Sequence, residues 1–310
     1  MSALGADLLH AAMGGATSVL PLSPDGHRVA LEIWFEGDGH LDHVLAMGQV
    51  ATGLALLVFT RARLAQAMAA GLRGLARPAL LQDTEAGRDA VAIVVGAVAA
   101  AILSGFLAPP MVHNRVPLVA AAGFLVTALG LVSTAWAPKA RGNAPSLGAG
   151  LVAGLAHGLA VVPGLSATAA AFVVLRWSSV RRWAAAELAL LIACPVYLLN
   201  GSRHLLEASG HLPETRILVG SAVAAFGAAT LAAVLWRTLC ERQATVFVGV
   251  WLATLALSAI AYDRALPAPA EALPIEAQAS SDRAGIRTDP GANVLGSPPM
   301  TLRGNRPLAT

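Results

Sequence analysis

The chain has few charged residues, few cysteines and a small net charge. Of its 310 residues, 13% are charged and 56% are hydrophobic, a balance that excludes a soluble globular domain and is typical of a polytopic membrane protein. The two cysteines, Cys194 and Cys240, lie in apolar segments, which excludes a disulfide framework. A net charge of +3 gives no argument for nucleic-acid binding, so we interpret the basic residues as topology signals. No basic stretch precedes the first apolar segment, and a cleaved signal peptide is not expected.

The apolar residues gather in segments long enough to cross a bilayer, for which a helix needs about 20 residues. The sequence therefore predicts an all-α polytopic membrane protein with about six transmembrane helices. The expected spans are 42–60, 90–108, 116–136, 183–199, 217–236 and 245–262. The polar connection 61–89 contains five arginines and is interpreted as an amphipathic surface helix. The tail, 263–310, is rich in Pro, Ala, Ser and charge, and we expect it to be disordered.

Two further apolar segments are too short to span and end at prolines. The first ends in TSVLPLSPDGH, from Thr17 to His27, and the second ends in VVPGLSAT, from Val161 to Thr168. Proline removes a backbone donor and clashes with the preceding helical turn, so a helix that enters here must break. Broken backbone at membrane depth is tolerated only inside protein or beside a water-filled cavity, and polar residues there indicate a functional site. We expect two re-entrant hairpins, at 6–35 and 147–176.

Each half of the chain then consists of one hairpin and three spans. The first repeat covers residues 1–136 and the second covers 147–262. Because three crossings is an odd number, the second half must insert upside down relative to the first. The sequence therefore predicts an inverted repeat, with a site near the midplane where the two hairpins meet.

The basic residues outside the tail predict the orientation. One face receives Arg61, Arg63, Arg73, Arg77, Arg88, Lys139, Arg141, Arg176, Arg181, Arg182, Arg237 and Arg242. The face that holds the first hairpin receives only Arg28, Arg115, Arg203 and Arg216. By the positive-inside rule the first face is cytoplasmic, so both termini are expected on the outer, periplasmic face.

The two breaks and the order of segments resemble the undecaprenyl-pyrophosphate phosphatase family, also called the bacitracin-resistance family. The family's first signature reads like TEFLPxSSTGH, and here it is TSVLPLSPDGH. Its second reads like QxLAxxPGxSRSGAT, and here it is HGLAVVPGLSATAAA, from His157 to Ala171. A Glu and a Pro of a later span are echoed by Glu187 and Pro195. The resemblance covers about 260 residues and implies a multi-pass protein of the bacterial inner membrane that recycles the lipid carrier of cell-wall synthesis.

Several motif positions depart from the family pattern. His27 and Ser23 match, but Ser18 stands at the glutamate before FLP, and the upstream glutamate falls on Gly14. Pro24 replaces the second serine. The arginine of SRSG is replaced by Ala167 and the serine after it by Thr168, and alanine cannot act as a bidentate phosphate clamp.

The resemblance implies hydrolysis of undecaprenyl diphosphate to the monophosphate, with a divalent cation (Mg²⁺ or Ca²⁺) assisting and its ligands unassigned. The predicted catalytic residues are His27, Ser23 and Asp25. The predicted substrate-binding residues are Ser18, Arg28, Gly164, Ser166 and Thr168. The expected partners are the polyprenyl diphosphate lipid, the membrane and a second copy of the chain, without nucleic acid. The alternative function is a non-catalytic polyprenyl-phosphate transporter or flippase, or a degenerate lipid-binding member of the family. Another cation beside the phosphate, such as Arg28 or Arg176, distinguishes an enzyme from these.

Structural interpretations compete with several of these roles. His27 and Asp25 are also candidates for helix caps, and Ser23 and Ser166 for partners of broken backbone. Glu187, a carboxylate in a span, is expected to pair with Arg182 or Arg176. His157 replaces the family's Gln and is a candidate bridge between the hairpins. The run EGDGHLDH, from Glu36 to His43, has metal-ligand residue types, but we expect a solvated loop.

Overall fold

The computed structural model describes residues 3–32, 41–111, 117–208 and 213–265, and within them every regular element is a helix. The long helices are α3 (Leu41–Phe59), α6 (Glu85–Met111), α7 (Pro117–Ser133), α10 (Arg182–Glu207), α11 (Thr215–Glu241) and α12 (Thr245–Ala265). The shorter helices are α1 (Ala3–Val19), α2 (Pro24–Glu32), α4 (Arg61–Ala76), α5 (Leu80–Asp83), η1 (Thr134–Trp136), α8 (Leu147–Gly158), η2 (Leu159–Val161) and α9 (Ala167–Trp177). The predicted tail lies outside the described residues, apart from its first three positions.

Six of the described helices are long and apolar enough to cross a membrane, which confirms the predicted all-α polytopic class. Many of their large apolar side chains are exposed, including Phe106 at 78% and Phe247 at 74%. A water-soluble protein does not expose so much apolar surface, whereas contact with lipid requires it. The protein is therefore a multi-pass membrane protein.

Both short apolar segments break at the proline-containing motifs, as the sequence predicted. α1 ends at Val19, and the chain turns before α2 starts with Pro24 at its first position, where a missing N–H costs nothing. In the second hairpin α8 tightens into η2, and Pro163 and Gly164 separate η2 from α9. The sequence thus forms two helix–break–helix units.

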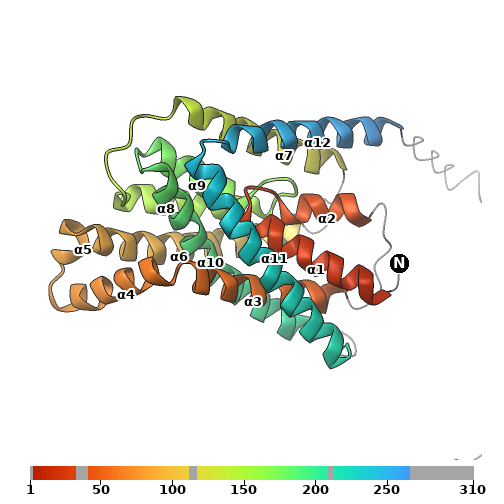
Figure 1. The fold of residues 1–310 in the computed structure, drawn as a ribbon, viewed down its shortest axis with the longest axis horizontal. Coiled ribbons are helices and arrows are strands. Elements are labelled where there is room, and N and C mark those ends of the chain that lie inside the picture. Colours follow the sequence, from red (N-terminus) through yellow and green to blue (C-terminus); the bar gives the residue numbers. More distant parts are fainter. Residues whose placement is uncertain (1–2, 33–40, 112–116, 209–212, 266–310) are drawn as a thin grey trace, which may run out of the picture. The chain divides into compact units, whose positions relative to one another are not determined.

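The helices of the two halves pair with one another (Figure 1). α1 packs against α11, α8 against α6, α3 against α10, and α7 against α12. α10 is the most enclosed of the candidate spans, with 72% of its apolar window buried against 22% for α12. α10 therefore forms the centre of the bundle and positions residues for both hairpins. The inverted orientation of the two halves stays a prediction.

A buried ion-pair network joins the polar connection to the bundle. Arg63 of α4 donates through Nε and NH2 to the Asp89 carboxylate, at 2.7 and 3.0 Å, and through NH1 to Glu187 Oε2 at 3.1 Å. Its guanidinium also donates to the backbone oxygens of Ala184 and Asn143. Burial lowers the pKa of Arg63, but the hydrogen bonds and charges of the two carboxylates outweigh it and raise the pKa above its usual value. The guanidinium therefore stays charged.

The expected partner of Glu187 was wrong. Arg182 donates to the hydroxyl of Thr245, and Arg176 donates to the backbone oxygen of Val180. Arg63 is 124 residues away from Glu187 in the sequence, so no local pattern pointed to this pair.

Candidate functional site

The two helix breaks are joined by buried hydroxyl groups. Ser23 Oγ accepts a hydrogen bond from the backbone N of Gly164 at 3.0 Å. Thr168 Oγ1 donates to the backbone oxygen of Ser18 at 2.7 Å. Because buried polar groups require partners in apolar surroundings, these bonds fix where the hairpins meet.

Helix α7 completes the junction through Thr127, which the sequence analysis missed. Thr127 Oγ1 donates to the oxygen of Gly164 and accepts from the N of Ser166, both at 3.1 Å. Gly164 has a φ of +87°, and a Cβ there would lie 2.0 Å from the oxygen of Ala120. Only glycine meets both conditions, which explains why the break contains a Pro-Gly step.

The two break serines cap the helices that follow. Ser23 Oγ accepts from the N of Gly26 at 3.1 Å, and Ser166 Oγ accepts from the N of Ala169 at 3.2 Å. The interpretation that these serines pair with broken backbone is therefore confirmed. The interpretation of Asp25 as the cap was wrong, because Ser23 occupies that position. A catalytic role for Ser23 stays a prediction.

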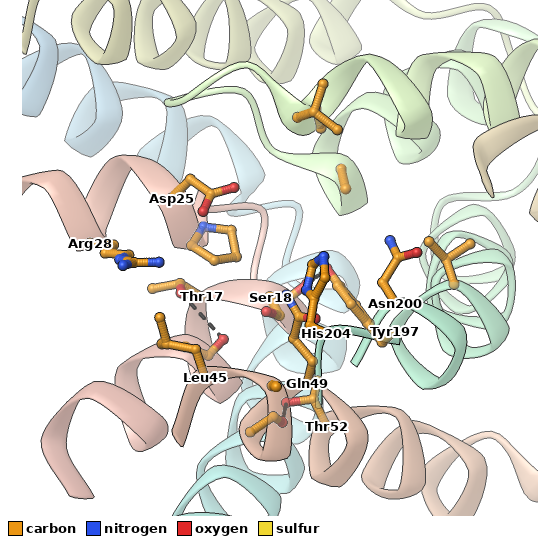
Figure 2. A pocket seen from close by; sticks show the side chains of 18 of the residues that line it. Thr17, Ser18, Asp25, Arg28, Leu45, Gln49, Thr52, Tyr197, Asn200 and His204 are labelled. Carbon is orange, nitrogen blue, oxygen red and sulfur yellow. Dashed lines mark hydrogen bonds between the residues drawn. The ribbon is translucent and has the colours of Figure 1, made fainter. Parts of the chain in front are cut away.

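A cavity of about 490 Å³ lies beside this junction. Figure 2 shows polar side chains from four helices around it: Thr17 and Ser18 of α1, Asp25 and Arg28 of α2, Gln49 and Thr52 of α3, and Tyr197, Asn200 and His204 of α10. Polar residues inside a membrane bundle cost free energy, and where they gather they indicate a ligand site or a pathway. The cavity is therefore the candidate site.

The predicted site residues fall into two groups. Those that line the cavity are His27, Asp25, Ser18 and Arg28. Those that join or cap the helix breaks, and are not among the lining residues, are Ser23, Gly164, Ser166 and Thr168. The second group shapes the site through the backbone.

His27 is held in one tautomer. Its Nδ1 lies 2.8 Å from the backbone oxygen of Ser23, and because a carbonyl only accepts, Nδ1 carries the proton. The ring also packs edge-on against Phe124, with centroids 5.4 Å apart. Nε2 is then the nitrogen whose lone pair can take a proton, as a general base requires.

Of the two arginines considered as replacement cations, Arg28 lines the cavity and Arg176 does not. Arg28 NH2 lies 3.8 Å from Asp42 Oδ1, and the arginine side chain is 18% exposed. Its guanidinium is therefore partly buried and brings a positive charge to the cavity wall. Arg28 thus supplies the positive charge that Ala167, also in the cavity wall, does not.

Helix α10 contributes polar residues to the cavity that the sequence motifs did not predict. Tyr197, Asn200, His204 and Glu207 all line the cavity, at spacings of three and four residues. Such spacing places them on one face of the helix, and a polar face within an apolar span was the signal that would have found them. Tyr197 also donates its hydroxyl proton to the backbone oxygen of Ser18 at 3.1 Å.

Metal-ligand side chains are not clustered in the part of the chain that the structure describes. Among the described residues, no three His, Cys, Asp or Glu side chains are grouped as a metal site would need. Glu36, Asp38 and His40 of the acidic run lie outside the described residues, and Asp42 and His43 belong to α3. We therefore derive no step through a metal.

The chain is similar in sequence to named bacterial proteins. It is 34% identical over 279 residues to an "Undecaprenyl-diphosphatase" of Anaeromyxobacter dehalogenans (strain 2CP-1), covering 83% of this chain and 91% of that protein. Proteins of the same name from Myxococcus xanthus and Trichlorobacter lovleyi are each 30% identical, over 76% and 71% of this chain and 80% and 84% of their own lengths. The sequence model of the family described as "Bacitracin resistance protein BacA" matches residues 8–257. The chain therefore belongs to the bacitracin resistance protein BacA family.

Proposed function

We propose that the chain is an undecaprenyl-diphosphate phosphatase, which hydrolyses undecaprenyl diphosphate to the monophosphate and inorganic phosphate. The observation that carries the proposal is the cavity at the joined helix breaks, with the imidazole of His27 and the guanidinium of Arg28 in its wall. The relatives named undecaprenyl-diphosphatase support the same substrate. The function belongs to lipid-carrier recycling for cell-wall synthesis.

In the proposed reaction, a water molecule attacks the terminal phosphorus. His27 accepts one proton of this water at Nε2 while the new P–O bond forms. The bridging P–O bond breaks, and its electron pair stays with the lipid monophosphate. Asp25, which lines the same cavity, is the alternative proton acceptor.

The negative charge of the diphosphate requires donors and cations. Arg28 donates N–H groups to phosphate oxygens and neutralises charge in the transition state. The N-terminal end of α9, where Leu165 and Ala167 line the cavity, adds the positive end of a helix dipole. The hydroxyl of Ser18 provides a further contact.

The transporter alternative is less well supported. A transporter can bind a phosphate with backbone dipoles and hydroxyls alone, whereas a hydrolase requires charge stabilisation at the reacting phosphorus. Arg28 in the cavity wall meets that requirement. We therefore prefer hydrolysis to transport or to simple lipid binding.

The membrane setting follows from the same argument. We place the protein in the bacterial inner membrane with the cavity open to the outer face, since the basic connections mark the opposite face as cytoplasmic. A homodimer and a requirement for Mg²⁺ or Ca²⁺ stay predictions, and the second is checked by adding and chelating the ion in the assay below.

The first test is phosphate release from undecaprenyl diphosphate by purified protein in detergent, compared with the Arg28→Ala variant. We expect kcat/KM to fall by about tenfold to a hundredfold, which is the loss expected when one hydrogen bond from a charged donor to the substrate is removed. Arg216→Ala is the matched control, because Arg216 pairs with Glu214, is 73% exposed and is not among the lining residues. Equal kcat/KM in the two variants would contradict the role of Arg28.

A further inference from the structure

His10 of α1 lies in the cavity wall, and one of its ring nitrogens has no partner among the described residues. The residue is 3% exposed, and its Nδ1 lies 2.8 Å from the backbone oxygen of Ala6. Since a carbonyl only accepts, Nδ1 carries the proton and Nε2 the lone pair. Nε2 is buried and has no hydrogen-bond partner among the described residues. A buried polar atom without a partner is rare and calls for a functional explanation.

The arrangement of His10 repeats that of His27. Each ring binds the carbonyl four residues earlier through Nδ1, at 2.8 Å in both cases, and each lines the same cavity. Two other buried atoms in the lining, Gln49 Oε1 and His157 Nδ1, also lack partners in the described part of the chain. Unsatisfied atoms from α1, α3 and α8 therefore gather on one cavity, which points to a polar ligand.

The position of His10 on α1 suggests what it does. His10, Gly14, Thr17 and Ser18 lie on one helix face, and Figure 2 shows the last two beside the cavity. The family motif has glutamates where this chain has Gly14 and Ser18. Both carboxylates are thus absent, and His10 is the one titratable residue of α1 among those that line the cavity.

We propose that His10 is a second acid–base residue of the phosphatase site, which holds and returns a proton of the diphosphate group through Nε2. This role rests on the proposed function. On binding, Nε2 takes the proton of the terminal phosphate hydroxyl. When the bond between the terminal phosphorus and the bridging oxygen breaks, Nε2–H gives that proton to the bridging oxygen of the leaving lipid monophosphate. The proton of the attacking water goes to His27, so charges and atoms balance.

The test compares His10→Gln with wild type in the phosphate-release assay. Glutamine keeps a polar side chain but cannot carry the proton, so we expect kcat to fall about a hundredfold and KM to change by less than about threefold. His43→Gln is the matched control, because His43 is also 3% exposed but does not line the cavity. We expect its kcat within about threefold of wild type, since it has no part in proton transfer.

A rescue variant separates chemistry from packing. Gly14 lines the cavity and a Cβ there meets nothing within 4 Å, so the side chain of Gly14→Glu would start in open space, one turn from residue 10. In the His10→Gln background we expect this change to restore kcat by about tenfold or more. Should His10→Gln fail to fold, the double variant is measured alone, and a folded double variant without turnover overturns the proposal.

The remaining outcomes decide between the two proposals. If the wild-type protein turns over and the kcat of His10→Gln lies within about threefold of the wild-type value, the role of His10 is overturned and the proposed function stands. No turnover by the folded wild-type protein overturns the proposed function and the role of His10 together.

Discussion

Replacement of His27 by alanine is expected to reduce phosphate release from undecaprenyl diphosphate by a factor of about 100 or more, with most of the loss in kcat. The variant lacks the Nε2 lone pair that, in the proposed reaction, accepts the proton of the attacking water. It also loses the hydrogen bond from Nδ1 to the backbone oxygen of Ser23, and we expect this loss to lower the free energy of unfolding by about 1 kcal/mol. The measurement is inorganic phosphate release by purified protein, with a thermal unfolding curve for each sample.

Two controls make this result specific. His27→Gln can keep a donor near Ser23 without a proton-accepting ring, so its turnover should fall as far as that of His27→Ala. His204→Ala removes an imidazole that also lines the cavity but lies on α10, and we expect a loss of less than about tenfold, because the proposed reaction gives His204 no proton to carry. Turnover of a folded His27→Ala protein within about threefold of wild type would exclude His27 as the base.

Replacement of Arg63 by alanine is expected to destabilise the fold by about 3–5 kcal/mol. The change leaves the carboxylates of Asp89 and Glu187 without their cation, and their side chains are only 7% and 19% exposed. It also removes the bonds that tie α4 to α10 and to the segment before α8. The measurement is equilibrium unfolding in mixed micelles, compared with wild type.

The neighbouring Arg61 provides a matched control. Arg61 begins the same helix, is exposed, and donates to the backbone oxygen of Val58. Arg61→Ala should therefore cost less than about 1 kcal/mol. Arg63→Lys should lie between the two, since an ammonium cannot replace a planar guanidinium that binds four groups. An unfolding midpoint of Arg63→Ala equal to that of Arg61→Ala would contradict the structural role of the network.

The helix breaks and spans were predictable because their causes are local. Pro24 forces a new helix start, Gly164 supplies the positive φ of the second break, and the apolar spans are long enough to be recognised by composition. His27 and Arg28 follow directly on the first break, so their place in the cavity wall was also within reach of the sequence.

The rest of the site depends on contacts between distant segments. Ser23 and Ser166 belong to short polar motifs, and the sequence alone does not separate a hydroxyl that pairs with backbone from one that binds phosphate. Thr127 joins the junction from a helix that reads only as an apolar span. For the same reason the sequence led to the wrong partner for Glu187. Arginines close to it in the sequence were preferred to Arg63, which lies on another helix.

The altered motifs are easier to interpret with the cavity in view. Gly14 leaves open space where the family has a glutamate, and Ala167 lines the wall where the family has an arginine. In our proposals, His10 and Arg28 provide the proton carrier and the cation from other positions around the same cavity. The chain thus keeps the two helix breaks that frame the cavity, while its residues at these motif positions differ from the family pattern.

The most direct test of the account is a ³¹P NMR time course of undecaprenyl diphosphate with purified wild-type protein in detergent. We predict that the paired diphosphate signals disappear and that two monophosphate signals, from the lipid and from inorganic phosphate, replace them. Diphosphate signals that broaden on binding but persist without product would contradict the account, because the cavity would then bind the head group without hydrolysing it.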